Sequence, residues 1–185
     1  VVNSLSKHYS VSRCIGGVAI FDSRPLFVNA FEKVRIFGWH VSPLHCKRIL
    51  EGLPGLVERK RKSYALANPV LDFLKAHPKV LDISYPLLGT HPSHYLKEVY
   101  LCTKEGELLG PDLIVFLVDK PLKEVKPKYR SLSILPAKTS YGGKESRLCP
   151  WPAGVAGQTW VRVSLGFEDT VEHTLAGLEE FLSFM

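Results

Sequence analysis

The segment that most constrains the fold is the unbroken apolar run Leu113-Ile114-Val115-Phe116-Leu117-Val118, which lies between Gly110-Pro111 and Lys120-Pro121. A short apolar run closed on both sides by turn-forming pairs predicts a buried strand. The run is far too short to cross a bilayer as a helix, which needs about 20 residues. The sequence therefore predicts a globular core around this strand and no membrane partner.

Three further segments have the pattern of strands. Residues 80–85 and 161–165 alternate between apolar and polar side chains, and residues 18–21 form a short apolar run behind Gly16-Gly17. The alternation is typical of half-buried strands, and the run after the glycine pair predicts a short buried one.

Helical spacing appears between and after these strands. Ser42 is a candidate cap with Pro43 in the first turn, and Pro54-Gly55 should interrupt the helix that follows. A second helical stretch is expected over residues 59–76, and a closing helix over 170–184, with Glu168 and Asp169 near its positive end. Residues 31–39 are interpreted as a helical or irregular link. These elements indicate an α+β layer that follows the end of a larger domain, with a boundary between residues 53 and 65.

Composition limits the class of protein. The chain has 185 residues, of which 45% are hydrophobic, enough for one domain or parts of two. Its start, Val1-Val2-Asn3, lacks a methionine and the pattern of a secretory signal, as in a chain that begins within a strand. The four cysteines form no CxxC pair, which argues against a zinc knuckle or a disulfide framework and predicts a cytoplasmic location.

The net charge of +6 is concentrated partly in residues 59–62 and 120–130. Such basic runs are more often solvated faces than binding sites. An RNA or DNA surface is the weaker alternative, because no aromatic side chains interleave with the charges as in a base-stacking platform. We therefore predict no nucleic-acid partner.

The first candidate for chemistry is the frame Ser4-Leu5-Ser6-Lys7, which precedes Gly16-Gly17. A lysine amine can form a Schiff base with the aldehyde of pyridoxal phosphate, and hydroxyls one and three residues earlier can donate hydrogen bonds to its phosphate. Taken alone, the frame is weak, and Lys7 could be an ordinary exposed lysine.

Three downstream segments strengthen this interpretation. They are residues 77–92, with His77-Pro78, Tyr85-Pro86 and His91-Pro92; residues 140–146, Ser-Tyr-Gly-Gly-Lys-Glu-Ser; and residues 162–169, Arg-Val-Ser-Leu-Gly-Phe-Glu-Asp. In this order after the lysine frame, they resemble the C-terminal half of the pyridoxal-phosphate enzymes of cysteine and methionine metabolism. That group includes cystathionine gamma-synthase, cystathionine gamma-lyase and O-acetylhomoserine sulfhydrylase.

The resemblance implies a fold. Residues 1–55 would form the end of the large domain of a fold-type I pyridoxal-phosphate-dependent transferase, together with the linking helix. Residues 56–185 would form its C-terminal small domain, an antiparallel sheet with helices on one face.

The resemblance also implies residue roles. Lys7 would be the Schiff-base lysine and proton carrier, and Ser4 and Ser6 would contact the cofactor phosphate. Arg162 would grip the α-carboxylate of an amino-acid substrate, with Ser140 beside it, which suits the planar fork of a guanidinium. The alternative is a purely structural role, with Arg162 as a surface residue and Gly142-Gly143 as a simple turn.

No metal is expected in this family. His91 and His94 are therefore interpreted as loop histidines, and Trp39, Trp151 and Trp160 as packing residues.

In enzymes of this kind the glycine-rich phosphate turn, the ring-stacking aromatic and the aspartate for the ring nitrogen precede the lysine segment. The resemblance therefore predicts an N-terminal half as a partner, on a separate or cleaved chain, and an oligomer, commonly a dimer of dimers. The reaction would be γ-replacement or γ-elimination on a homoserine- or cystathionine-type substrate. Thr139, where some lyases carry glutamate, tilts the prediction towards a synthase or sulfhydrylase.

Two stretches depart from the family pattern, Val11-Ser12-Arg13-Cys14 and Cys149-Pro150-Trp151-Pro152. They leave open a second hypothesis, in which the chain is a degenerate, non-catalytic module or partner subunit of such an enzyme.

Overall fold

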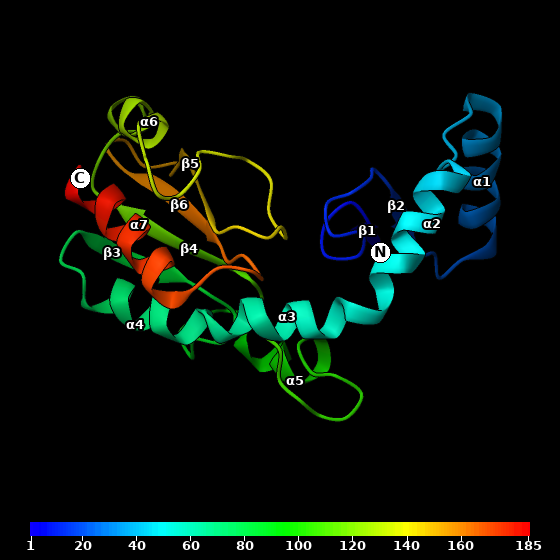
Figure 1. Ribbon diagram of the computed structural model, residues 1–185, viewed down its shortest axis with the longest axis horizontal. Helices are drawn as coiled ribbons and strands as arrows, with labels where there is room; N and C mark the ends of the chain where they lie inside the picture. Colours follow the sequence, from blue (N-terminus) through cyan, green and yellow to red (C-terminus); the bar gives the residue numbers. More distant parts are fainter. The chain divides into compact units, whose positions relative to one another are not determined.

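The computed structural model describes residues 1–185 and divides into two compact units, Val1–Val57 and Glu58–Met185 (Figure 1). The boundary lies next to the start of helix α3 (Leu56–Ala65). We describe each unit by itself.

The first unit is a small hairpin with two helices. Strands β1 (Val2–Ser4) and β2 (Gly17–Ala19) pair antiparallel, and they are followed by α1 (Arg24–Phe37), α2 (Pro43–Gly52) and the 3-10 turn η1 (Leu53–Gly55). As predicted, α2 begins with Ser42 as its cap, whose hydroxyl accepts a hydrogen bond from the His45 N–H at 3.3 Å. The predicted interruption at Pro54-Gly55 is confirmed by η1.

This first unit contains almost no apolar core of its own. Ile49 is its one buried large apolar side chain, and α1 buries no residue. The prediction of a buried strand over residues 18–21 is therefore wrong, because β2 is exposed throughout and Ile20 is 62% exposed. Of the two alternatives for residues 31–39, helical or irregular, the helical one holds up to Phe37, because these residues are the second half of α1, which ends where Gly38 takes a left-handed φ of 68°.

The second unit is built on a four-stranded antiparallel sheet in the order β3-β4-β6-β5. Its strands are β3 (Val80–Ser84), β4 (Leu113–Val118), β5 (Arg147–Pro152) and β6 (Thr159–Ser164). The apolar run that opened the sequence argument is β4, with the predicted bounds, and it lies inside the sheet between β3 and β6.

Helices α4 (Ala67–Ala76) and α7 (Val171–Ser183) pack over one face of this sheet (Figure 1). The core forms where buried residues of α7 meet alternate residues of the central strands; for example, the Phe116 and Phe181 rings lie edge to face at 6.2 Å. The remaining elements are η2 (His94–Leu96), α5 (Lys97–Tyr100) and α6 (Leu122–Arg130), the last of which packs beside β5. An antiparallel sheet with helices on one face is the predicted architecture.

Prolines explain where the helices and strands differ from expectation. The helical stretch expected over residues 59–76 is divided into α3 and α4, because Pro69 has no N–H to donate to the Ala65 carbonyl. Strand β5 was not predicted, since Pro150 and Pro152 argue against a strand; it forms because β5 is an edge strand, where proline is tolerated.

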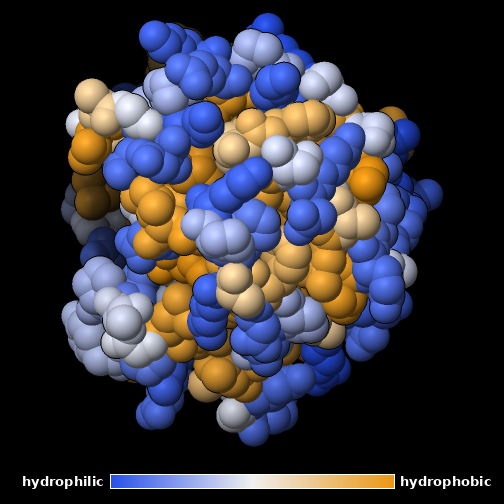
Figure 2. Space-filling model, turned by 90° about the vertical axis from the view of Figure 1, so that its left-hand side faces the viewer, coloured by the Kyte–Doolittle hydropathy of each residue, from blue (hydrophilic) through white to orange (hydrophobic).

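Helix α6 occupies the second basic run, where no helix was expected, and its lysines are exposed. Figure 2 shows one face of the molecule, on which hydrophobic residues lie in patches separated by hydrophilic ones. Exposed apolar side chains in the second unit include Leu81, half exposed on the edge strand β3, and Phe184 just after α7.

Candidate functional site

The predicted lysine lies in the turn that joins β1 to β2. The Ser6 hydroxyl donates to the Gly16 carbonyl at 3.1 Å and accepts from the Gly16 N–H at 2.9 Å. The Leu5 N–H donates to the same carbonyl at 2.9 Å. These three hydrogen bonds close the base of the turn. Lys7 is the next residue after Ser6 and is half-buried.

The donor groups of this turn fit pyridoxal phosphate. An amine can bond the cofactor aldehyde, and the hydroxyls of Ser4 and Ser6 can donate to a phosphate oxygen. Ser6 can turn its proton away from Gly16 without leaving that carbonyl unpaired, because the Leu5 N–H continues to satisfy it. The turn can therefore present Ser6 to an anion without losing its own closure.

The stretch after Lys7 has an unusual backbone. Val11 and Ser12 have φ values of 57° and 59°, in the left-handed region. A β-branched residue rarely adopts this conformation, and each such residue costs on the order of 1–3 kcal/mol. The part of the chain that departs from the family pattern is thus also the part with backbone strain.

The second group of predicted residues lies in the second unit, around Arg162 on β6. One guanidinium nitrogen, Nη2, donates to the carbonyl oxygens of Thr139 and Ser140. The guanidinium carbon lies 4.7 Å from the ring centre of Trp151 and 5.4 Å from that of Tyr141. Arginine over an aromatic face is attracted by the ring, so the two rings fix the orientation of the guanidinium.

Arg162 projects from the sheet face opposite the core. It pairs with Cys149 on β5, whereas its core-facing neighbour Val161 is fully buried. The nearby Tyr129 hydroxyl has its pKa raised to about 12, mainly by burial and further by the Cys149 thiol, while Arg162 acts in the opposite direction. Tyr129 therefore stays protonated at neutral pH beside the guanidinium.

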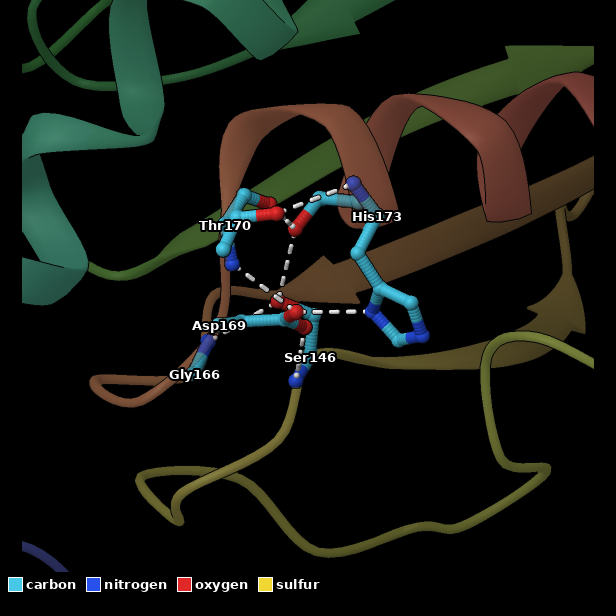
Figure 3. Close-up of polar contacts among 6 residues, drawn as sticks. Ser146, Gly166, Asp169, Thr170 and His173 are labelled. Atoms are coloured by element: carbon cyan, nitrogen blue, oxygen red, sulfur yellow. Dashed lines mark hydrogen bonds and ion pairs between the residues drawn. The ribbon is translucent and has the colours of Figure 1, made fainter.

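A buried hydroxyl ties the loop before β5 to the turn after β6 (Figure 3). The Ser146 Oγ accepts from the Gly166 N–H at 3.0 Å and lies 3.1 Å from the Thr174 Oγ1. Thr174 uses its proton on the Thr170 carbonyl at 2.8 Å, so Ser146 is the donor to Thr174. A Cβ on Gly166 would lie 2.3 Å from the Lys144 carbonyl oxygen, so this close approach requires glycine.

The Asp169 carboxylate holds the same junction from the other side (Figure 3). It accepts from the Ser146 N–H at 2.9 Å, the Thr170 N–H at 3.0 Å and the His173 Nδ1 at 2.7 Å. Burial raises the pKa of Asp169, but hydrogen bonds from Ser146 and Thr170 and the charge of His173 outweigh it, so the pKa lies below its usual range. We call Ser146, Gly166 and Asp169 the loop clamp, because they fix the loop that carries Ser140.

Comparison with known proteins identifies the family. The family of Cys/Met metabolism PLP-dependent enzymes matches residues 1–180. The chain belongs to this family. Cystathionine gamma-lyase of Dictyostelium discoideum is 27% identical over 186 residues, which cover 97% of this chain and 46% of that protein. O-succinylhomoserine sulfhydrylase of Mycobacterium tuberculosis is 29% identical over 205 residues, covering 99% of this chain and 48% of that protein.

Solved structures of the family have the same fold. Cystathionine gamma-lyase from yeast matches with a TM-score of 0.78 and 26% identity, over 99% of this chain and 49% of that one. Cystathionine gamma-synthase from Xanthomonas oryzae matches with a TM-score of 0.77 over 100% of this chain and 51% of that one, at 22% identity. The fold is thus that of fold-type I pyridoxal-phosphate enzymes, and the chain spans about half the length of the relatives it matches.

Within this family member, the structure groups the predicted residues by unit. Ser4, Ser6 and Lys7 share one turn of the first unit, and Ser140 and Arg162 meet in the second through the Ser140 carbonyl.

Sequence reasoning missed the residues that surround these groups. Trp151, interpreted as a packing residue, is 41% exposed and stacks on Arg162. The loop clamp was also missed, although Asp169 had been placed near the start of the last helix, because its partners are distant in sequence.

The remaining candidates have local roles. His91 and His94 bond backbone groups, the Ser93 N–H and the Pro86 carbonyl respectively. The structure has no cluster of three or more His, Cys, Asp or Glu side chains suited to a metal. None of its helices combines the length and the apolarity that a membrane span requires.

Proposed function

We propose that the chain is the C-terminal part of a pyridoxal-phosphate enzyme of sulfur amino-acid metabolism, which performs γ-replacement or γ-elimination on a homoserine- or cystathionine-type substrate. The observation that carries the proposal is the Lys7 turn, whose amine and hydroxyls fit the aldehyde and the phosphate of the cofactor. Family membership over residues 1–180 supports it, because the match includes both Lys7 and Arg162.

The proposed mechanism assigns each residue one task. Lys7 would hold the cofactor through its Nζ amine, and the same amine would take the proton from the substrate Cα. Ser4 and Ser6 donate hydrogen bonds to the phosphate and so orient the ring. Bound pyridoxal phosphate supplies an electron sink for the carbanion next to the substrate nitrogen.

Arg162 holds the substrate α-carboxylate, and Trp151 and Tyr141 keep its guanidinium oriented. Ser140 lines the same place, and its carbonyl already accepts from Arg162 at 3.4 Å. Thr139, at the position before it, favours the synthase or sulfhydrylase direction over the lyase direction.

We further propose that an N-terminal half completes the enzyme. Support comes from α1, which buries none of its residues and leaves Phe27 and Phe31 each 50% exposed. Such an apolar surface is costly in water and is expected to be covered by protein. The chain spans about half of its relatives' length, so the companion half is the occupant we propose, within an oligomer such as a dimer of dimers. The four cysteines, all free, support the cytoplasm as the location.

Borohydride reduction followed by intact and peptide mass measurement tests the proposal on the protein as isolated, with every chain recorded. A phosphopyridoxyl adduct on the peptide that carries Lys7 is expected, and Lys7→Ala should remove it. Lys47→Ala is the matched control, because Lys47 lies on α2 of the same unit and is 74% exposed. Substrate turnover that survives Lys7→Ala would refute the assigned role.

A second candidate is a non-catalytic module that stabilises a partner subunit. It is favoured by the left-handed backbone of Val11 and Ser12, in the stretch that departs from the family pattern. This alternative predicts association with a partner and no adduct on Lys7 in the same mass measurement.

A further inference from the structure

A cavity of about 260 Å³ lies within the second unit, between helix α6 and the edge strand β5. Its walls are mainly apolar and are formed from α6 by Leu122 and Tyr129, and from β5 by Pro150, Trp151 and Pro152. Sites for small molecules in proteins are mostly apolar and have volumes from about 300 Å³ upwards. This cavity is close to that lower limit, so it suits a molecule with one small ring system.

The inner wall of the cavity is uncharged. It is formed by Cys149, which is 4% exposed, and Tyr129, which is 9% exposed. The Tyr129 hydroxyl is hydrogen-bonded to the Cys149 thiol, and burial, together with this neighbour, raises the pKa of Tyr129 to about 12. The phenol therefore stays neutral at pH 7, and both polar groups are already paired. An apolar body can contact this wall without leaving a polar group unsatisfied.

Two cations lie at the rim of the cavity. Lys126 and Arg130 line it from α6, and both are exposed. They share a helix face with Leu122, because residues four apart along an α-helix are neighbours. No acidic residue lines the cavity, and neither cation forms an ion pair with another part of the chain. The rim therefore attracts an anion.

Other cavities of the second unit lack this combination. One of about 350 Å³ beside β3 is lined by both Lys75 and Asp82, and one of about 380 Å³ near the C-terminus is lined by Lys79, Lys120 and Asp119. Such mixed charges select no single sign of ligand. The cavity between α6 and β5 differs because its charges have one sign and its walls are apolar.

The cavity also adjoins the Arg162 group. Trp151 lines it, and the ring of Trp151 lies 4.7 Å from the guanidinium carbon of Arg162. Thr139 lines it as well, and the Thr139 carbonyl oxygen accepts a hydrogen bond from Arg162 Nη2. A ligand in the cavity therefore contacts two of the residues that hold the guanidinium.

We propose that the cavity between α6 and β5 binds a small aromatic carboxylate, which acts as an effector of the Arg162 site. The ring of the ligand packs against Tyr129 and Trp151, since aromatic rings attract one another beyond the effect of area burial. Its carboxylate lies at the rim and pairs with Lys126 and Arg130. The packed ring restricts Trp151 and so pre-orients the Arg162 guanidinium, which strengthens carboxylate binding there. This last step rests on the proposed function, in which Arg162 holds the substrate α-carboxylate.

Calorimetric titration of the protein as isolated, at low ionic strength, tests binding. The probe is hydrocinnamate, whose short stem lets its carboxylate reach the rim, and hydrocinnamamide is its neutral counterpart of the same shape. We expect hydrocinnamate to bind with a Kd of about 1 mM or below, as for a ligand of about 11 non-hydrogen atoms. Hydrocinnamamide should bind about 3–10-fold more weakly, because it forms no charge pair with the two exposed cations.

Paired variants locate the anion. Lys126→Gln with Arg130→Gln should weaken hydrocinnamate binding about 3–10-fold and leave hydrocinnamamide binding unchanged. Lys123→Gln with Lys128→Gln is the matched control, because it removes the same charge from exposed positions of α6 that do not line the cavity.

Leu122→Trp should fill the cavity and remove binding of both probes, and thermal unfolding checks that this variant folds. Both double variants keep every wall residue, so they test the site even if Leu122→Trp folds poorly.

A second titration tests the effector role. Acetate should bind several-fold more tightly in the presence of saturating hydrocinnamate, and by linkage acetate should tighten hydrocinnamate binding by the same factor. Unchanged or weaker acetate binding overturns the effector role.

The site itself is overturned if hydrocinnamate binds no more tightly than hydrocinnamamide, or if the two double variants behave alike. Arg162→Gln separates this inference from the proposed function. Acetate binding that survives this change refutes the carboxylate grip of Arg162, whereas hydrocinnamate binding should be retained. Loss of hydrocinnamate binding in Arg162→Gln would place the anion on Arg162 and overturn the separate site.

Discussion

Replacing Asp169 by alanine should destabilise the second unit through the loop clamp. The carboxylate accepts hydrogen bonds from the Ser146 N–H at 2.9 Å, the Thr170 N–H at 3.0 Å and the His173 ring at 2.7 Å. Loss of the acceptor leaves the Ser146 N–H unpaired at a partly buried position, which costs about 1–3 kcal/mol. The exposed histidine pair adds about 0.5 kcal/mol.

The Thr170 N–H contributes less, because it lies at the open start of α7 and water can replace the carboxylate. We therefore expect a loss of about 2–4 kcal/mol in the free energy of unfolding at pH 7. For a unit of this size, about 3–4 °C of thermal midpoint correspond to each kcal/mol, so the midpoint should fall by roughly 6–16 °C.

The effect should depend on pH with a defined sign. The folded-state pKa of Asp169 is held below its usual value, because the hydrogen bonds from Ser146 and Thr170 outweigh the effect of burial. The stabilisation is therefore complete above the unfolded pKa of about 3.9 and is lost as the pH falls through the folded pKa. The gap between wild type and Asp169→Ala should narrow as the pH is lowered below about 4.

Thermal unfolding followed by circular dichroism, at pH 7 and at a series of acidic pH values, measures both effects. Asp72→Ala is the matched control, because Asp72 lies on α4 of the same unit, is 78% exposed and only approaches Lys75 at 3.8 Å. Equal midpoints for Asp169→Ala and Asp72→Ala at pH 7, or a gap that stays constant into the acid range, would refute the reasoning.

Two further changes test the proposals. Trp151→Ala removes the ring that lies 4.7 Å from the Arg162 guanidinium, a contact worth about 0.5–2 kcal/mol, and should weaken acetate binding by about 2–30-fold in calorimetry. Trp151→Phe should retain most of the affinity, and an unchanged affinity in Trp151→Ala would exclude the orienting role. The double change Phe27→Ser with Phe31→Ser should weaken association with the companion half in sedimentation velocity, because both rings are 50% exposed on α1. Phe184→Ser, at a 40% exposed position of the other unit, should leave that association unaltered; equal behaviour of the two variants would contradict the docking role of α1.

Local patterns predicted the elements whose stability is local. Strand β4 has its predicted bounds, and Ser42 caps α2 as expected, because an apolar run between turn pairs and a hydroxyl before Pro43 act over a few residues. The closing helix α7 lies within the expected range 170–184, with Thr170 as its cap, a role that the sequence analysis did not assign. Proline accounts for two of the differences: the edge strand β5, which contains Pro150 and Pro152, was not predicted, and the break that Pro69 causes between α3 and α4 was overlooked.

The burial of the first unit was also mispredicted. Residues 18–21 have the composition of a buried strand, yet every residue of β2 is exposed. An apolar sequence states which side chains favour removal from water, but burial requires a second surface. The first unit's own elements supply no such surface, which is the basis for proposing a companion half.

The sequence by itself determined the family and the elements with strong local signals, such as β4, α2 and α7. The ordered set of Lys7, Ser140 and Arg162 segments led to the family, and the family match over residues 1–180 confirms this recognition. Tertiary structure alone decided what surrounds those groups. Trp151 stacks on Arg162, and Arg147 faces Ser164, only because the register of β5 on β6 brings them to one face of the sheet. That register results from hydrogen bonds and burial along whole strands, which no local pattern of residues specifies.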